Sequence, residues 1–482
     1  MLTRGGNAVD AAIAVVAAQG VVAPETCGIG GDLFALVHRP GDKQPVAINA
    51  SGMAGSRADA TELRDAGHLQ VPRSHRMSVT VPGCVDGLVA LSERFGTWGL
   101  SACLEPAMTL AVQGFKASAE QARAFAATAD VYRENPAVSD FYPDGEPVAE
   151  GDLVRRPDLG RTLGGIAREG RSGFYEGPAG ADIVEALAPY VTEDDLAVEQ
   201  FEWTEPIGRQ IDGVWAWTMP PNSAGYLGPA TLAVFLATDP PDDPEDPLWW
   251  HLLIEAHRSL AWERERLVAD PRNAPEPAAS LLSDDYIGRA ASAISVDRAG
   301  TWPTRPSATT DTAYICVSDG DGMAVSTINS NYRGTGSPYG ARRSGFLLHD
   351  RGAGFSLVPG HPNELAPGKR PAHTLSPTLW TVGNRAAWLL GTRGGEVQPQ
   401  LVAQLAARAI VNGTPLEDAQ SAPRWAMTSY GAGERSSVSL EPGAERVGQA
   451  LREMGHEVDE LSEHKSGWGP MSIVDLTASP PK

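Results

Sequence analysis

Hydrophobic and polar positions alternate along the chain between helical and strand periods. An Ala-rich helix is predicted over GNAVDAAIAVVAAQGVV (residues 6–22), opened by glycines and ended by Gly20 and Pro24. The CGIGGDLFALV segment that follows (27–37) predicts a glycine turn entering a strand. Its glycines lack the spacing of a dinucleotide-binding loop, so we interpret them as positions where two stretches of backbone approach closely.

The later part of the chain continues this alternation. Residues 248–270 carry an apolar stripe at helical spacing and predict a long helix, preceded by a proline- and acid-rich surface loop at 238–247. Residues 282–305 have the composition of a loop. Beyond residue 312, strand and helix patterns alternate again, which favours an α/β layered fold.

Thr312 begins the first of two predicted strands within residues 308–336. A threonine hydroxyl is a poor nucleophile unless a base lies beside it. Cleavage of the peptide bond between Asp311 and Thr312 would free an α-amine with a pKa near ~8, which suits a general base. Taken alone, this local pattern favours a threonine that merely opens a strand, because β-branched residues often do so.

Further motifs occur in one order and change that balance. They are residues 4–37, the segment around Thr312, APGKRPAHTLSPTL (366–379) and LLGTRGGEVQPQL (389–401). Together with residues 105–115 and 251–271, they resemble the γ-glutamyltransferase (γ-glutamyltranspeptidase) family of N-terminal-nucleophile hydrolases over nearly the whole chain. The resemblance implies an α/β fold of the four-layer αββα sandwich type.

The resemblance also implies self-cleavage before Thr312, the position of the family's nucleophile. The products would be a large chain of residues 1–311 and a small chain of residues 312–482, which together form one layered domain. Thr309 and Thr310 are weaker candidates, because only Thr312 keeps the family's spacing to the turn at residues 321–322.

Three other positions match the family's catalytic machinery. Ser330 falls on a hydroxyl residue that assists processing and the nucleophile, and Gly394 and Gly395 fall on the glycine pair whose N–H groups form the oxyanion hole. Glycines let a loop approach a tetrahedral intermediate closely. Losing one oxyanion donor typically costs about 3–4 kcal/mol of transition-state stabilisation.

Several positions depart from the transpeptidase pattern. The family's substrate arginine is replaced by Ser51, its acidic residue by Gly354, its asparagine by Tyr332 and its paired serines by His373 and Thr374. A serine hydroxyl cannot replace a bidentate arginine clamp on a carboxylate. We therefore expect the amide-cutting machinery to be kept and the pocket for a γ-glutamyl group to be rebuilt.

These residues predict an amidohydrolase or acyltransferase that forms an acyl-enzyme on Thr312 and passes the acyl group to water or an amine. The expected substrate is a small anionic or acyl amide, as in family members such as cephalosporin-type acylases and oxamate amidohydrolase. Arg351, His373 and Asn331 are candidates for binding it, with Ser51 and Thr374 at family substrate positions. Two alternatives remain open: a true γ-glutamyl hydrolase or transpeptidase acting on glutathione, and an uncleaved, non-catalytic binding protein.

Composition limits the possible partners. The formal net charge of −21 and pI near 4.9 argue against nucleic acid or an anionic membrane surface. No apolar run reaches the ~20 residues of a membrane helix. The expected partners are the amide substrate, its acceptor and the two chains of the precursor, with a dimer of processed pairs as a possibility.

No cofactor or metal is predicted. His251 and His257 lie six residues apart and fall on different helical faces, so a packed or solvated helix explains them better than a metal site, and His456 and His464 look isolated among carboxylates. The four cysteines lack CxxC spacing and predict buried free thiols. With no basic, apolar leader visible, we expect a cytoplasmic protein, while the early first motif leaves open that upstream residues are missing.

Overall fold

The computed structural model describes residues 1–303, 311–427 and 437–478. These divide into two compact units, each containing chain from both sides of Thr312. Unit 1 comprises 1–39, 46–204 and 311–372, and unit 2 comprises 40–45, 205–310 and 373–482. The predicted boundary between large and small chains therefore passes through both units.

Unit 1 is built on a five-stranded antiparallel sheet with the order β5-β2-β1-β9-β8. Its strands are β1 (Asp32–His38), β2 (Val46–Ala50), β5 (Glu202–Thr204), β8 (Asp311–Ser318) and β9 (Ala324–Tyr332), with the short β3 (Phe115–Lys116), β4 (Leu153–Val154), β10 (Gly340–Ala341) and β11 (Phe346–Leu347) outside it. Its α-helices are α1 (Ala8–Val22), α2 (Ala60–Asp65), α3 (Cys84–Phe95), α4 (Leu100–Gln113), α5 (Ala119–Ala127), α6 (Ala129–Tyr132), α7 (Pro157–Glu169), α8 (Ser172–Tyr175), α9 (Pro178–Leu187) and α10 (Glu193–Ala197). Its 3-10 helices are η1 (Leu2–Arg4), η2 (Arg76–Ser78), η3 (Pro136–Phe141), η4 (Pro143–Gly145) and η6 (Arg351–Gly354).

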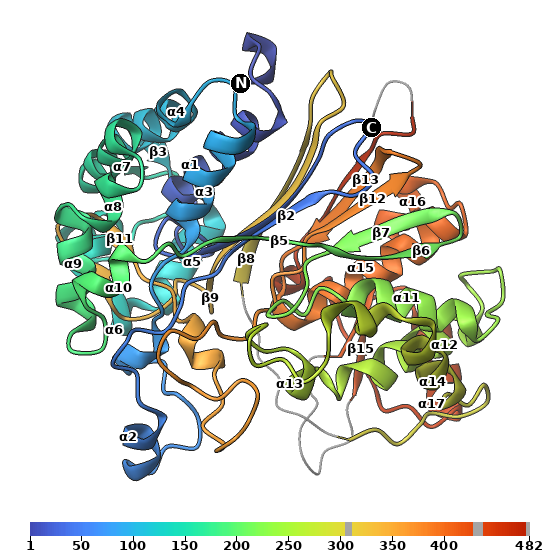
Figure 1. The fold of residues 1–482 in the computed structure, drawn as a ribbon. Helices are drawn as coiled ribbons and strands as arrows, with labels where there is room; N and C mark the ends of the chain where they lie inside the picture. Colours follow the sequence, from blue (N-terminus) through green and yellow to red (C-terminus); the bar gives the residue numbers. More distant parts are fainter. Residues whose placement is uncertain (304–310, 428–436, 479–482) are drawn as a thin grey trace. The chain divides into compact units, whose positions relative to one another are not determined.

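The helix α1 lies against the sheet of unit 1 and contacts β8 and β9 (Figure 1). It begins with a capping box, in which the Asn7 side chain accepts the N–H groups of Val9 and Asp10, and Asp10 accepts the N–H of Asn7. Its alanines allow the close packing on a sheet that the sequence predicts. The helix continues past Gly20 to Val22. Gly20 does not end the helix; a Cβ there would lie 3.0 Å from Gly28 Cα, so the glycine permits a close backbone approach.

Unit 2 is built on a second five-stranded antiparallel sheet, ordered β17-β13-β12-β7-β6. Its strands are β6 (Ile207–Ile211), β7 (Val214–Thr218), β12 (Thr378–Val382), β13 (Arg385–Thr392) and β17 (Met471–Asp475), with β14 (Trp425–Ala426), β15 (Val438–Leu440) and β16 (Val458–Glu460) in a smaller sheet. Its helices are α11 (Leu227–Ala237), α12 (Pro247–Ala261), α13 (Arg264–Leu267), α14 (Asp284–Ser292), α15 (Gln398–Ala406), α16 (Leu416–Ser421) and α17 (Glu445–Glu453), with η5 (Ala278–Leu282), η7 (Gly395–Val397), the π-helical η8 (Ala407–Val411) and η9 (Ser466–Trp468). The helices α11 and α15 pack on each other and on strands of this sheet.

Two helix predictions in unit 2 need correction. The long helix expected over 248–270 is broken into α12 and α13, which are separated at Trp262 and Glu263. The stretch 282–305 is not all loop, because α14 forms within it. The Ser283 hydroxyl accepts the Tyr286 N–H as an N-cap, and Tyr286 and Ile287 are buried.

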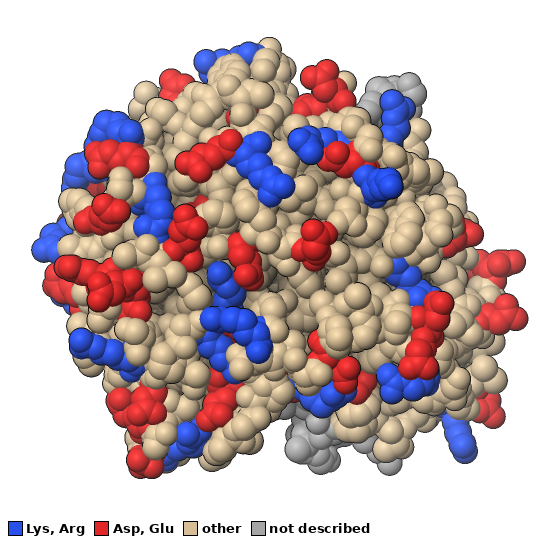
Figure 2. Space-filling view, viewed as in Figure 1, with Lys and Arg blue, Asp and Glu red and all other residues tan. Residues whose placement is uncertain are grey.

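Charged side chains of both signs are interspersed over the face drawn in Figure 2. Within the described ranges, every helix falls short of the length and apolarity needed to cross a bilayer. The cysteines are free thiols, as predicted; Cys27, Cys84 and Cys103 are buried, and Cys316 is half-buried.

Candidate active site

Thr312 lies at a break in the pairing between β8 and β9. Asp311 pairs with Tyr332 and Ala313 pairs with Asn329, so Ser330 and Asn331 together lie opposite Thr312. This is the geometry of a β-bulge, which re-aims side chains and is frequent beside active sites. The Thr312 side chain is buried, and only 2% of the residue is exposed.

Ser330 is within hydrogen-bond reach of the predicted nucleophile. The Thr312 Oγ1 hydroxyl donates to Ser330 Oγ over 3.4 Å, and the Tyr332 N–H donates to the same Ser330 oxygen over 2.8 Å. A long contact at a catalytic hydroxyl is common before substrate is bound. The predicted partnership of the two hydroxyls is thus present as geometry, while its catalytic role stays a prediction.

The glycine turn of residues 28–31 packs directly behind β9. A Cβ on Gly31 would lie 2.4 Å from the Ser330 carbonyl oxygen, and one on Gly30 would lie 2.1 Å from the Leu347 oxygen. The Asn329 side chain accepts the Gly28 N–H over 2.9 Å. The interpretation of close backbone approach is confirmed, and the turn supports the strand that carries Ser330.

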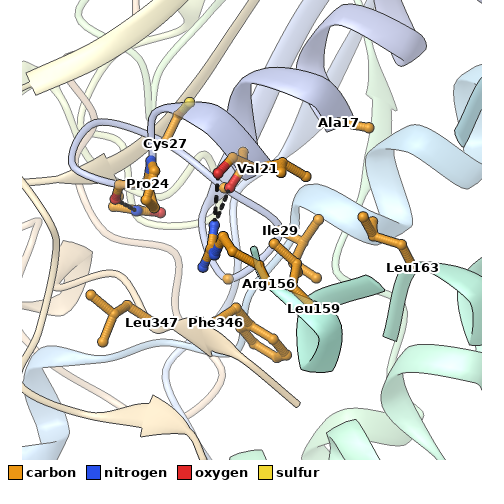
Figure 3. A pocket seen from close by; sticks show the side chains of 14 residues that line it. Ala17, Val21, Pro24, Cys27, Ile29, Arg156, Leu159, Leu163, Phe346 and Leu347 are labelled. Carbon is orange, nitrogen blue, oxygen red and sulfur yellow. Dashed lines mark hydrogen bonds between the residues drawn. The ribbon is translucent and has the colours of Figure 1, made fainter. Parts of the chain in front are cut away.

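Asn331, a predicted substrate-binding residue, has its side chain directed to this turn. Its Nδ2 donates to the Pro24 oxygen over 3.2 Å. It also lines a cavity of about 10 Å³ with Gly28 and Arg156, a volume that suits about one water molecule. In Figure 3 the Arg156 guanidinium reaches across this cavity, and it donates to the Gly20 and Val21 carbonyls at the end of α1.

Ser51, at the family's arginine position, is held by its own strand end. Its Oγ donates to Asn49 Oδ1 over 2.7 Å, and its N–H donates to the same oxygen over 3.1 Å. The residue is fully buried. An uncharged side chain in this arrangement offers no counter-charge to a carboxylate.

Arg351 supplies a buried cation in unit 1, the unit that also holds Thr312 and Ser330. Its Nε lies 4.0 Å from the Asp32 carboxylate, and its guanidinium lies over the Tyr332 ring, 4.0 Å from the centroid. The neighbouring His349 Nδ1 accepts the backbone N–H of Arg351 over 3.0 Å. Burial lowers the pKa of His349. His349 is therefore neutral at physiological pH and leaves the positive charge to Arg351.

Sequence reasoning did not single out Asp32. Its carboxylate accepts the Gly52 N–H over 2.9 Å, and its backbone pairs with that of Ser330 across β1 and β9. The available signal was its position directly after the glycine turn, at the first residue of a buried strand. A carboxylate placed there needs polar partners, which Gly52 and Arg351 provide.

The remaining predicted site residues belong to unit 2. Gly394 and Gly395 form the turn between β13 and α15 and have φ of 117° and 60°, values that favour glycine. The backbone N–H of His373 donates to the backbone oxygen of Asn222 over 2.7 Å. His373 and the next residue, Thr374, are both buried. The oxyanion role of the glycines and the substrate roles of His373 and Thr374 stay predictions.

Thr309 and Thr310 lie outside the described residues, as does the side chain of Asp311. The backbone of Asp311 is the first residue of β8. The scissile bond predicted from the sequence thus joins the first two residues of β8, a strand paired with β9.

The histidines of α12 pack inside unit 2. His251 Nδ1 lies 2.7 Å from His456 Nε2, and His257 Nδ1 lies 3.3 Å from Thr231 Oγ1. The prediction that His456 is isolated is therefore wrong, because tertiary packing pairs two histidines that are far apart in sequence. Within the described residues, no group of three or more His, Cys, Asp or Glu side chains is arranged to hold a metal ion.

Several known proteins match this chain over nearly its whole length. The family described as Gamma-glutamyltranspeptidase matches residues 1–479. A glutathione hydrolase-like proenzyme (YwrD) of Bacillus subtilis is 34% identical over 99% of this chain and 91% of its own length. The oxamate amidohydrolase proenzyme of Klebsiella pneumoniae is 32% identical over 98% and 91%, respectively.

A solved structure is also similar to this chain over nearly its whole length. The cephalosporin acylase from Bacillus halodurans superposes with a TM-score of 0.89 at 31% identity, covering 98% of this chain and 88% of that one. The predicted fold class, an α/β fold of the N-terminal-nucleophile type, is confirmed by this match. With the family's sequence pattern matched from residue 1 to residue 479, the chain belongs to the γ-glutamyltranspeptidase family.

Proposed function

We propose that this protein is a self-processing threonine amidohydrolase whose substrate is a short acyl amide carrying a carboxylate. Family membership makes it an enzyme that acts on amide bonds. The observation that carries the residue assignment is the buried Thr312 hydroxyl at the β8–β9 bulge, 3.4 Å from Ser330 Oγ.

Processing would precede catalysis. Thr312 Oγ attacks the carbonyl carbon of Asp311, the Asp311–Thr312 C–N bond breaks, and the acyl group moves to oxygen as an ester. Water then hydrolyses the ester, which leaves a carboxylate on Asp311 and a free α-amine on Thr312. The hydroxyl of Ser330 lies where it can assist the attacking oxygen.

Turnover would use the new amine as general base. It takes the proton from Thr312 Oγ as the oxygen attacks the substrate carbonyl, and it returns the proton to the departing amine. The N–H groups of Gly394 and Gly395 are the proposed donors to the oxyanion. Water attacks the resulting ester and releases the acid, or an acceptor amine takes the acyl group.

The substrate class rests on the charges of unit 1. Ser51 lacks a cation at the family's arginine position, while Arg351 provides a fully buried one beside Asp32. Gly354 has no side chain with which to receive an ammonium group. These residues favour a short anionic acyl group over a γ-glutamyl group, and the oxamate amidohydrolase relative acts on a molecule of that kind.

Cleavage of a γ-glutamyl bond is the second candidate. The observation in its favour is the 34% identity to a protein named as glutathione hydrolase-like. The two candidates differ in the charge pattern of the acyl group, because a γ-glutamyl group carries an ammonium group that oxamate lacks.

The test begins with processing. Purified wild-type protein is expected to give two bands on a denaturing gel, with mass spectrometry placing the start of the smaller chain at Thr312. Thr312→Ala removes the nucleophile, so cleavage and turnover should both fall below detection, whereas Thr312→Ser keeps a hydroxyl and should process slowly. Normal cleavage of the Thr312→Ala protein would contradict the assignment.

The processed enzyme is then assayed with oxamate, γ-glutamyl anilide and an aromatic acyl amide. We expect kcat/KM for oxamate to exceed that for the γ-glutamyl compound by at least about tenfold, which corresponds to ~1.4 kcal/mol of transition-state preference. A preference for the γ-glutamyl compound would establish the second candidate instead.

A further inference from the structure

Tyr332 adopts an unusual backbone conformation at the position facing the predicted cut. It pairs with Asp311 in the ladder between β8 and β9 and has φ of 78°. Among the described residues, the other non-glycine positions with positive φ are Asp144, Asp212 and Asp239. Aspartate tolerates this region through local hydrogen bonds, whereas tyrosine rarely adopts it, and such outliers concentrate at functional sites.

Polar contacts on both sides hold this conformation. The Tyr332 N–H donates to Ser330 Oγ over 2.8 Å, and the next N–H, that of Arg333, donates to Asp350 Oδ1 over 3.1 Å. The chain thus leaves β9 immediately after Tyr332, and the tyrosine side chain stays buried with 5% of the residue exposed. The same residue that fixes the Ser330 oxygen therefore also sets the position of an aromatic ring.

The ring of Tyr332 lies against two guanidinium groups. The Arg351 guanidinium carbon is 4.0 Å from the ring centroid, and that of Arg333 is 5.2 Å from it. Both distances are within the range of a cation–π interaction. We call Tyr332, Arg333 and Arg351 the Tyr332 platform.

Gly354 makes room for the tyrosine hydroxyl. A Cβ on Gly354 would lie 3.6 Å from Tyr332 Oη, in van der Waals contact with it, so a side chain extending toward the ring would meet the hydroxyl. The glycine at 354 and the tyrosine at 332, two departures from the transpeptidase pattern, are therefore neighbours in space.

The platform carries a positive charge. Arg351 lies beside the Asp32 carboxylate, Arg73 forms an ion pair with Asp350, and the Arg333 guanidinium lies over the Tyr332 ring while its backbone N–H donates to Asp350. Three cations against two carboxylates leave one positive charge, since the lowered pKa of His349 keeps that ring neutral. Among the described residues, the buried Nε of Arg333 has no hydrogen-bond partner. An anionic ligand would satisfy both the charge and this donor.

We propose that the Tyr332 platform is the carboxylate-binding site of this enzyme, and that Tyr332 determines its specificity by presenting the two guanidinium groups beside Ser330. The ligand class is a short acyl group ending in a carboxylate. This inference rests on the proposed function for its link to catalysis, while its binding component can be measured separately.

The kinetic test compares oxamate with oxamide, which has the same planar shape and no carboxylate. Tyr332→Asn tolerates the left-handed backbone but removes the ring, so we expect it to lower the oxamate-to-oxamide ratio of kcat/KM about tenfold. Tyr332→Phe keeps the ring and should change that ratio by less than about threefold. An unchanged ratio in Tyr332→Asn would overturn the proposal. Mass spectrometry confirms that each variant is processed before it is assayed.

A binding test stands independently of turnover and of the Tyr332 variants. Oxalate binding to the processed wild-type protein is measured by calorimetry and compared with Arg333→Gln, using the exposed Arg342→Gln as the control for loss of one charge. We expect Arg333→Gln to weaken binding about tenfold or more and Arg342→Gln to leave it unchanged.

The two tests separate the possible failures. Oxalate binding that depends on Arg333 without oxamate turnover would leave the site standing and contradict the proposed substrate. Equal oxalate affinity in Arg333→Gln and wild type, or no oxalate binding at all, would overturn the platform as a carboxylate site.

Discussion

At the scale of single residues, the backbone of Gly394 is as informative as any side chain. Its φ of 117° is accessible to glycine and strained for other residues. A Cβ there would lie 2.7 Å from the Val397 side chain, so alanine would force the turn to shift. If the N–H groups of this turn bind the oxyanion, such a shift would misplace them.

We therefore predict that Gly394→Ala lowers kcat by about 10²–10³ while the protein still folds. The matched control is Gly383→Ala in the turn between β12 and β13, where φ is 58° and a Cβ would meet no atom within 4 Å. This control carries backbone strain without a collision and should retain kcat. Steady-state kinetics and circular dichroism of both variants measure the two effects, and a Gly394→Ala enzyme with normal kcat would exclude the turn from catalysis.

At the scale of elements, α12 and the chain after α17 meet through buried histidines. His251 Nε2 lies 2.8 Å from the Ser295 carbonyl oxygen and donates to it, and His251 Nδ1 lies 2.7 Å from His456 Nε2. One of these two facing nitrogens must be unprotonated to accept the hydrogen bond, so the pair cannot hold two charged rings. Burial, together with the neighbouring His251 and Arg258, lowers the pKa of His456 to about 3.

This lowered pKa predicts acid sensitivity. An unfolded histidine has a pKa near ~6.5, so between about pH 6.5 and pH 3 the unfolded chain binds a proton that the folded chain does not. The stability contributed by neutral His456 is complete above that window and is lost as the pH falls. At pH 5 the loss amounts to about 2 kcal/mol.

The measurement compares urea unfolding of wild type and His456→Gln at pH 7 and pH 5. The free energy of unfolding should fall by about 2 kcal/mol more in wild type, because glutamine cannot be protonated. The comparison cancels the pH dependence of groups common to both proteins. One of these is Asp86, whose pKa is raised to about 6 by burial. Equal pH dependence in the two proteins would contradict a buried neutral His456.

At the scale of the whole molecule, the predicted cut does not separate the two compact units. In unit 1, β8 and β9 of the predicted small chain pair with β1 of the large chain. In unit 2, β7 of the large chain pairs with β12 of the small chain. The end of the described large chain is also anchored, because the Glu255 carboxylate accepts the Gly300 N–H and the Trp302 Nε1–H, each over 2.9 Å.

We predict that the two chains remain associated after cleavage and separate only in denaturant. Fully processed protein should elute from a size-exclusion column at the same volume as the uncleaved Thr312→Ala variant, with both chains in one peak. Release of the small chain under native conditions would contradict the shared sheets. The same elution volume tests the predicted dimer of processed pairs.

The sequence predicted local structure well where the residues of a single helix, strand or loop determine its conformation. The Ala-rich helix, the loop at 238–247 and the strand and helix around Gly394 are all present. It was less successful where neighbours decide the outcome. The break between α12 and α13 and the formation of α14 depend on which side chains become buried, and periodicity does not show that.

By itself, the sequence determined the family, the reaction class and Thr312 as the candidate nucleophile, because ordered motifs and spacing are properties of the chain alone. Only the tertiary structure decided that Ser330 approaches Thr312 at a bulge, that His456 meets His251, and that Tyr332 lies against the guanidinium groups of Arg333 and Arg351. The physical reason is that hydrogen bonds, ring contacts and burial depend on distances of a few ångströms between residues that strand pairing and helix packing bring together.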